Sequence, residues 1–265
     1  MRISIVQSSL HWENPEANRA MFSEKLSALQ GATDLVVLPE MFSTGFSMNA
    51  KAFAEPMNGP TMDWLRSTSK ELNAAVTGSF ICMEGDKYFN RLVFMRPDGQ
   101  FDFYDKKHLF SLANENECFA AGRKRLTVEW QGWRICPLIC YDLRFPAWSR
   151  NTAGTFLNGL TPYYDVLIYV ANWPNRRAHH WRSLLAARAI ENQAFVVGVN
   201  IAGFDGNGLE YNGDSAIIDY SGESFAHIPD GLEDIDTVEL SLDNLRAYRQ
   251  QLPFLADADS FEFKG

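Results

Sequence analysis

Three short, uninterrupted apolar runs constrain the fold of this chain more than any other feature of its sequence. The runs LVVL, DVLIYV and FVVGV begin at residues 35, 165 and 195. Strands that are apolar on both faces occur in sheets that helices cover, and helical periodicity separates these runs, for example over residues 179–193. Hairpin-like segments with turn sequences such as PDGQ also occur. The pattern predicts an α/β domain with a sheet that is not purely parallel.

The chain shows no internal repeat and no linker rich in Pro, Gly or Ser, so we expect a single domain over residues 1–265. A content of 46% apolar residues is sufficient for a large core. The last predicted helix, at 241–250, is followed by a tail with more apolar side chains than a free terminus needs. We therefore expect residues 251–265 to dock on the fold or on a neighbouring subunit.

Charge and cysteine content exclude several classes of protein. A net charge of -9 argues against nucleic acid as a partner, because no basic field would attract a phosphate backbone. No apolar run approaches the roughly 18 residues of a membrane span. The 4 cysteines form no CxxC pair, and the 5 histidines form no HExxH motif, so we expect no metal site. A cytoplasmic protein with reduced thiols is the expectation.

Polar side chains stand where several of the predicted strands end. Open α/β sheets bind ligands beyond the carboxyl ends of their strands, so residues at these ends are candidates for a site. One is a carboxylate, one is a thiol, and others are ammonium, amide and indole groups. These residues are Glu40, Lys106, Lys107, Cys140, Asn172 and Trp173.

A carboxylate, an ammonium group and a thiol suffice for acyl transfer. A cysteine with a pKa of about 8.5 is only a few per cent thiolate at neutral pH. Glu40 can accept the proton of the Cys140 thiol, and the lysine can balance the charge that results. The lysine and the backbone N–H of Tyr141 can then stabilise an oxyanion. The expected product of the first step is a thioester on Cys140.

The motifs LPEMF, YDKKHLF and CYDLRFP, in this order, resemble the nitrilase superfamily of carbon–nitrogen hydrolases with its Glu–Lys–Cys triad. The likeness runs nearly end to end. It implies that Glu40 is the general base and Cys140 the nucleophile. It assigns the lysine to Lys106, two residues before the His of HLF, with Lys107 as the competing neighbour. Only one of the two can enter the site, because successive strand residues face opposite sides.

The resemblance also implies a second carboxylate and a fold. The second carboxylate lies seven residues before Gly122, which makes it Glu115, with Glu117 as the local alternative. It would position the lysine, the substrate amide or the attacking water. The implied fold is the nitrilase-type α-β-β-α four-layer sandwich, assembled by pairing sheets across subunits. A homodimer or a higher homo-oligomer is therefore expected.

Within the superfamily, the stretches LPEMFSTGFSM, HLFSLANENE and GVNIAGFDGNG resemble the ω-amidase branch. These enzymes cleave the terminal amide of 2-oxoglutaramate and similar small 2-oxo acid amides and release ammonia. The resemblance thus implies a small amide substrate, a thioester intermediate and no cofactor. Related branches act on N-carbamoyl amines, on ureidopropionate or on nitriles, and these remain alternatives.

The residues that bind the substrate are less well defined by the sequence. An anionic substrate favours an arginine, and Arg176 or Arg177 is the candidate. For Arg144 we expect a structural role, in which it braces the loop after the nucleophile through Asp142. The side chains Phe42, Phe46, Asn172 and Trp173 are candidates for the wall of the pocket.

Three other interpretations compete with this one. The first is a papain-like hydrolase in which His108 or His180 activates Cys140, although no papain-like sequence surrounds the cysteine. The second is an α/β binding protein without catalysis. The third is a redox pair of Cys136 and Cys140, which would stand too far apart on an extended strand to form a disulfide.

Overall fold

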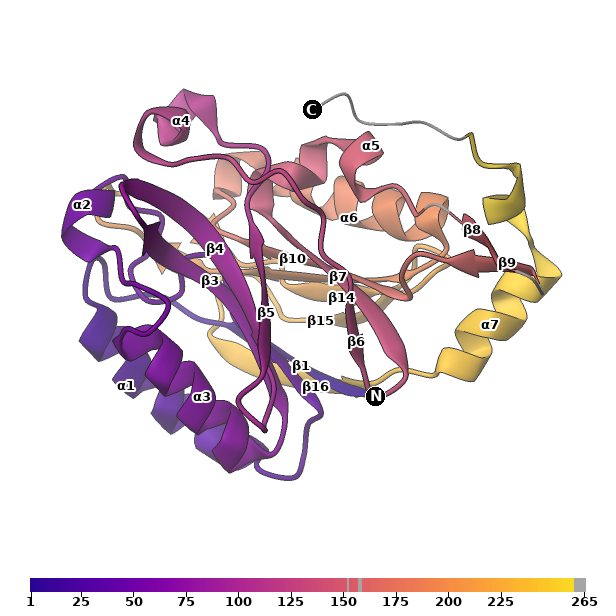
Figure 1. Cartoon of the computed structure of the whole chain (residues 1–265), viewed down its shortest axis with the longest axis horizontal. Coiled ribbons are helices and arrows are strands. Elements are labelled where there is room, and N and C mark those ends of the chain that lie inside the picture. Colours follow the sequence, from indigo (N-terminus) through magenta and orange to yellow (C-terminus); the bar gives the residue numbers. More distant parts are fainter. Residues whose placement is uncertain (152, 157–158, 260–265) are drawn as a thin grey trace.

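Two six-stranded sheets lie face to face and carry helices on their outer sides (Figure 1). The computed structural model describes residues 1–151, 153–156 and 159–259. The first sheet has the order β16-β1-β2-β3-β4-β5, and the second has the order β15-β14-β11-β10-β7-β6. The strands of the first sheet are β1 (Arg2–Gln7), β2 (Leu35–Val37), β3 (Ala75–Glu84), β4 (Lys87–Met95), β5 (Phe101–Asp105) and β16 (Asp234–Glu239). Those of the second are β6 (Val128–Trp130), β7 (Trp133–Ile139), β10 (Val166–Ala171), β11 (Phe195–Asn200), β14 (Ala216–Ile218) and β15 (Ser224–His227).

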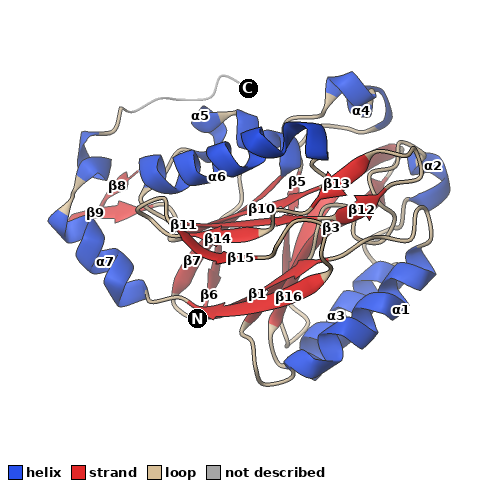
Figure 2. Cartoon of the chain, turned by 180° about the vertical axis from the view of Figure 1, so that it is seen from behind, coloured by secondary structure: helices blue, strands red, loops and turns tan. Residues whose placement is uncertain are grey.

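Helices cover the outer face of each sheet, as the view from behind also shows (Figure 2). Helices α1 (Pro15–Leu26) and α3 (Pro60–Leu72) lie on the first sheet, and α6 (Ala178–Asn192) lies on the second. The remaining helices are α2 (Ala50–Phe53), α4 (Glu115–Cys118), α5 (Pro146–Ser149) and α7 (Leu242–Gln251). Two small hairpins pair β8 (Ala153–Phe156) with β9 (Gly159–Pro162) and β12 (Ala202–Phe204) with β13 (Glu210–Asn212). The predicted α-β-β-α sandwich is confirmed.

All four layers come from one chain, which corrects the expectation that sheets pair across subunits to build the sandwich. The central core contains Ile5 and Phe94 from the first sheet and Leu138 and Ile168 from the second. A separate outer core lies between the first sheet and its helices and includes Phe22. The inner faces of both sheets are therefore buried against each other within the chain.

Local sequence explains why the helices begin and pack where they do. Asn14 caps α1 by accepting a hydrogen bond from the N–H of Ala17, and Pro15 occupies the first helical position. Gly198, the glycine in the apolar run of β11, allows α6 to lie close to the sheet. A Cβ atom at this position would lie only 2.5 Å from Leu185 Cδ1.

Parallel pairing brings the strand ends to one edge of each sheet. Strands β1, β2 and β3 are parallel, as are β7, β10 and β11, whereas the hairpin partners are antiparallel. The sequence of residues 144–154, RFPAWSRNTAG, predicts a helix, but the only α-helix among its described residues is the short α5, which β8 follows. None of the described helices has the length and apolar character that crossing a membrane requires.

The chain after α7 contacts its own fold. Leu255 is buried, and the carbonyl of Leu252 accepts a hydrogen bond of 2.8 Å from Gln193 Nε2. Residues 260–265, the end of the tail for which docking is predicted, lie outside the described residues.

Candidate active site

Four chain segments from both sheets converge on one buried cluster. Glu40 follows β2, and Lys106 follows β5 directly, both in the first sheet. Cys140 follows β7 and Asn172 follows β10, both in the second. Glu115 comes from outside the sheets, as the first residue of α4. The site thus lies where the strand ends of the two sheets meet.

Lys106 forms ion pairs with both glutamates. Its Nζ lies 2.8 Å from Glu40 Oε1, and 3.0 and 2.9 Å from the two carboxylate oxygens of Glu115. The side chains of all three residues are 0% exposed. Glu117 and Lys107, the neighbours that competed for these positions, do not form these contacts. Lys107 Nζ instead lies over the ring of Trp148.

Further donors fix the two carboxylates. Asn90 Nδ2 donates to Glu40 at 2.8 Å and to Glu115 at 3.2 Å. The backbone N–H of Asn172 donates to the other oxygen of Glu40 at 2.8 Å, and that of Phe110 donates to Glu115 at 2.6 Å. No sequence motif points to Asn90. The only signal is a buried amide that precedes the apolar end of β4.

Cys140 lies at the first position of a tight turn. A 3-10 helix, η3 (Cys140–Arg144), begins directly after β7, and Cys140 has a φ of 42°. This left-handed conformation is unfavourable for a residue other than glycine and occurs often at functional sites. Cys140 is 9% exposed, and its Sγ lies 4.0 Å from the carbonyl oxygen of Asn172. The N–H of Tyr141 lies in the first turn of the helix, where amides have no partner within the helix.

Burial and the two carboxylates determine the protonation of the cluster. Burial, followed by the charge of Glu40, raises the pKa of the Cys140 thiol well above 9. For Lys106, burial acts to lower the pKa, but Glu115 and Glu40 outweigh it and raise the pKa above its usual value. Burial also raises the pKa of Glu115 above 4.5. The resting site therefore holds a neutral thiol and a charged lysine.

The thiol opens into a cavity of about 480 Å³. Asn172 and Trp173 line this cavity, as predicted from the sequence, and so does Arg176. Aromatic side chains form much of the remaining wall, and the ring of Phe46 lies 5.1 Å from Lys106 Nζ. The other aromatic lining residues are Trp12, Phe110, Tyr141 and Tyr211.

Three arginines line the same cavity. Arg144 lies 4.6 Å from the ring centre of Trp173, and Arg177 lies 5.4 Å from that of Phe110. Arg176 is exposed. Within the described part of the chain, none of the three guanidinium groups forms an ion pair with a carboxylate. Two carboxylates, Glu13 and Asp205, also line the cavity, so its wall carries a small net positive charge that is available to an anionic ligand.

Two of the predicted roles are wrong. Phe42 does not line the cavity. It is fully buried in the outer core, where its ring packs against those of Phe22 and Trp64. Arg144 does not brace Asp142, because the tight turn directs its side chain to Trp173 in the cavity wall.

The two histidines that a papain-like mechanism requires are engaged elsewhere. His108 Nδ1 lies 2.8 Å from Asp142 Oδ1, and His180 Nδ1 lies 3.2 Å from a nitrogen of Arg144. Among the described residues no histidine forms a hydrogen bond with the Cys140 thiol. Cys136 and Cys140 are both free thiols.

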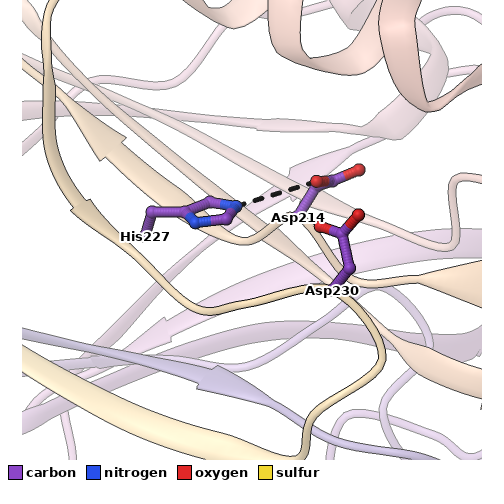
Figure 3. Close-up of side chains that lie close together, drawn as sticks. All are labelled: Asp214, His227 and Asp230. Carbon is purple, nitrogen blue, oxygen red and sulfur yellow. Dashed lines mark ion pairs between the residues drawn. The ribbon is translucent and has the colours of Figure 1, made fainter.

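One other group of side chains has the composition of a metal site. Asp214, His227 and Asp230 each offer a ligand atom, and these atoms lie within 4.8 Å of one another (Figure 3). However, Arg182 already contacts both oxygens of Asp214, at 3.0 and 2.9 Å. Because a guanidinium group neutralises the one buried carboxylate, we interpret this group as an ion-pair cluster.

A larger cavity of about 750 Å³ lies between the β6–β7 hairpin and α7. The buried carboxylate in its wall, Asp165, is paired with Arg249 at 2.7 Å and accepts the backbone N–H of Arg134 at 3.1 Å. No cysteine lines this cavity in the described part of the chain. The smaller cavity, which Cys140 lines, is therefore the candidate active site.

Known proteins of similar sequence and structure point to one family. The profile of the carbon–nitrogen hydrolase family matches residues 2–250. The chain is 45% identical to an omega-amidase YafV of Yersinia enterocolitica, with 98% of each chain covered. It is 34% identical to a 2-oxoglutaramate amidase of Bacillus subtilis, with 96% of each covered. Among solved structures, the CN-hydrolase superfamily protein XC1258 of Xanthomonas campestris, which holds an arsenic adduct in its active site, matches with a TM-score of 0.96. It is 46% identical, and the match covers 99% of this chain and 98% of that one.

Proposed function

Because the chain belongs to the carbon–nitrogen hydrolase family, we propose that it is an amidohydrolase that cleaves the terminal amide of a small 2-oxo acid amide such as 2-oxoglutaramate. The observation that carries this proposal is the buried cluster of Glu40, Lys106 and Glu115 beside a cysteine that opens into a cationic cavity. The names of the relatives support the choice of substrate.

Cys140 is the nucleophile and Glu40 the general base of the proposed mechanism. Since the resting thiol is neutral, its proton must leave as Sγ attacks the amide carbon. Glu40 accepts this proton and then donates it to the leaving nitrogen, so that ammonia departs and a thioester remains on Cys140. In the second half, Glu40 takes a proton from water, the hydroxide attacks the thioester carbon, and Sγ leaves with the proton. The product is the free carboxylic acid.

Lys106 and the backbone N–H of Tyr141 stabilise the oxyanion that forms in each half of the reaction. Lys106 remains protonated throughout, because two carboxylates raise its pKa. Glu115 holds Nζ in place through both of its oxygens, and so acts as a positioning residue for the lysine.

The arginines bind the carboxylate of the substrate. Arg177 is the better candidate of the two neighbouring arginines, because it is half-buried and lies over the ring of Phe110 in the cavity wall, whereas Arg176 is exposed. Burial and the neighbouring charges of Arg176 and Arg144 lower the pKa of Arg177, which is the pattern of a cationic group that lacks an anion. Trp173 forms part of the cavity wall. The amide of Asn172 donates to the carbonyl of Glu40, which places the base beside the cavity.

The proposal is tested by ammonia release from a panel of compounds with wild type and Cys140→Ala. The panel contains 2-oxoglutaramate, succinamate, glutamine, N-carbamoyl-β-alanine and an aliphatic nitrile. We expect turnover of 2-oxoglutaramate by the wild type alone. If only the carbamoyl compound or the nitrile is turned over, the assignment of Cys140 as the nucleophile stands and the proposed substrate is wrong. Turnover that persists in Cys140→Ala would reject the mechanism.

We further propose that the chain acts as one cytoplasmic domain that forms a homo-oligomer through its α6 and α7 side. Its free cysteines are compatible with a reducing compartment. Ile190, Phe225 and Phe254 are each at least half exposed on or near these helices, which supports an interface there. Light scattering of the full chain, and of a chain that ends at Gln251, tests this. An unchanged mass and stability after truncation would reject a role of the tail in assembly.

A further inference from the structure

We propose that Asp142 is a positioning residue, which ties the turn that carries Cys140 to the segment that carries Lys106. This inference rests on the proposed function, because it assigns a further residue to the same site. Asp142 is fully buried, does not line the cavity and is not needed for the steps described above. What it does for the reaction follows from its four contacts.

Each carboxylate oxygen of Asp142 accepts one backbone N–H and contacts one side chain. Oδ2 accepts the N–H of Ile139 at 3.1 Å and the hydroxyl of Tyr104 at 2.8 Å. Oδ1 accepts the N–H of His108 at 3.0 Å and lies 2.8 Å from His108 Nδ1. The carboxylate is thus held from two directions, and each of its oxygens has two polar partners.

These partners belong to the two halves of the active site. Ile139 is the residue before the nucleophile, on β7 of the second sheet. Tyr104 lies on β5 of the first sheet, two residues before Lys106, and His108 lies in the loop after β5, two residues beyond Lys106. A single side chain therefore sets the relative position of the thiol and the ammonium group. The Tyr104 hydroxyl is itself fixed, because it accepts the N–H of Lys107 at 3.1 Å.

The turn that Asp142 holds is one that needs external support. Cys140 has a positive φ, a conformation that persists in a non-glycine residue only where its surroundings determine it. Asp142 bonds back to the N–H of Ile139 and so closes the turn around Cys140. On the other side, the His108 ring stacks on Phe145 with centroids 3.8 Å apart and planes at 8°.

An asparagine cannot replace this carboxylate without loss. Both oxygens of Asp142 face a backbone N–H, so the amide nitrogen of an asparagine would point at a donor in either orientation. We expect Asp142→Asn to shift the turn and lower kcat about 10²-fold, as small misplacements of reacting groups do. KM should change little, because the arginines of the cavity are not involved.

The test compares Asp142→Asn with the matched control Asp165→Asn in the full-length chain. Asp165 is also a buried carboxylate that accepts a backbone N–H, but it lies directly before β10, at the end of the strand opposite to Asn172. Four quantities are measured: kcat for the amide, KM for the amide, the pH profile of Cys140 alkylation by iodoacetamide, and thermal stability. We expect slower alkylation and a lower kcat in Asp142→Asn alone. Wild-type values in Asp142→Asn, or equal losses in Asp165→Asn, would overturn the proposal.

A second variant keeps the test decisive if Asp142→Asn fails to fold. His108→Phe preserves an aromatic ring to stack on Phe145 and removes only the contact of Nδ1 with Asp142. The loss of one such hydrogen bond corresponds to a decrease of up to about tenfold in kcat and in alkylation rate. No change in either rate would overturn the proposal.

Alkylation also separates this proposal from the proposed function. If wild-type Cys140 reacts no faster than Cys118, the nucleophile itself is rejected, and Asp142 has nothing to position. If wild-type Cys140 reacts fast and both variants match it, the nucleophile stands and the positioning role is rejected.

Discussion

Two regions of the molecule each combine two carboxylates with one cation, but their surroundings differ. Around Lys106, the side chains of both glutamates are completely buried, and amides from Asn90, Phe110 and Asn172 donate to their oxygens. Around Arg182, the cation is 50% exposed, and of the two aspartates only Asp214 is buried. The first region adjoins a thiol at a cavity. No residue of the second region, whose two aspartates Figure 3 shows, lines that cavity.

This difference shows what makes a charged cluster suitable for catalysis. An exposed ion pair is solvated whichever way its side chains turn, so it holds no particular geometry. A fully buried cluster has to satisfy each charge internally, and its hydrogen bonds then fix each atom in advance of the reaction. We expect substitutions in the Lys106 cluster to affect turnover strongly and substitutions in the Arg182 cluster to affect mainly stability.

The largest effect should come from Cys140→Ser. A hydroxyl has a far higher pKa than a thiol, and Glu40 cannot deprotonate it to a useful extent, so turnover should fall by about 10⁴-fold or more. The fold should survive, because serine is nearly isosteric. Ammonia release and thermal melting measure the two effects. Substantial turnover by this variant would show that the buried cluster serves some other nucleophile.

Glu40→Gln should lower turnover by about 10²- to 10⁴-fold, the usual contribution of a general base. The variant cannot accept the thiol proton, and its amide nitrogen would also face donors, since both oxygens of Glu40 accept hydrogen bonds. Single-turnover kinetics should show a slow acylation step. A variant with normal acylation would assign the base to another residue.

Glu115 should make the activity of the cluster around Lys106 depend on pH in the acid range. Because burial raises the pKa of Glu115 above 4.5, the residue gains a proton and loses its hold on Lys106 before the pH falls to 4.5. The acid limb of kcat/KM should therefore lie above pH 4.5, and Glu115→Gln should lower activity about 10²-fold at neutral pH through a displaced lysine.

Stability should respond to Glu115 in the opposite sense. A carboxyl group whose pKa is higher in the folded state stabilises that state most below pH 4.5, and this contribution is lost as the pH rises through the raised pKa. The unfolding free energy of wild type should therefore fall relative to that of Glu115→Gln as the pH rises from 4.5 through the raised pKa of Glu115. An acid limb at or below pH 4.5 would contradict the assignment.

The smallest effect on turnover should come from Asp214→Asn. Asparagine tolerates the positive φ of 56° at this position, so the substitution removes the carboxylate without straining the backbone. Arg182 can reach water once its partner is gone, which limits the loss of stability to about 1 kcal/mol. Activity should stay at the wild-type level. A marked loss of activity would mean that the Arg182 cluster is coupled to the active site.

Much of this arrangement could be predicted from the sequence, because the ends of apolar strands can be recognised in it. Glu40, Lys106, Cys140 and Asn172 each follow an apolar strand, and parallel pairing gathers such positions. Glu115 lies in a loop helix, where only the resemblance to a family points to it.

Other features depend on tertiary structure and were missed or wrongly assigned. Asn90 lies within a strand, and no pattern distinguishes its amide from a satisfied core residue. Phe42 stands two residues after Glu40, but the chain there turns into the outer core. Arg144 was expected to brace the loop through Asp142. The 3-10 turn at Cys140 instead places Arg144 in the cavity wall and buries Asp142 away from the cavity, and no sequence pattern shows this turn geometry.

Site-resolved alkylation of the four cysteines tests the central claim, that the buried cluster makes Cys140 a nucleophile. Cys118 is more exposed than the other three cysteines, whereas burial raises the pKa of Cys82 to about 11, that of Cys136 to about 12 and that of Cys140 well above its usual value. Cys140 can therefore react fast only if a neighbouring base removes its proton. Mass spectrometry after timed exposure to iodoacetamide gives each rate in wild type and in Glu40→Gln. We expect Cys140 to react well ahead of Cys118 in wild type and to lose this lead in Glu40→Gln. If Cys118 reacts first, or if the lead of Cys140 survives without the carboxylate, the cluster does not activate the thiol.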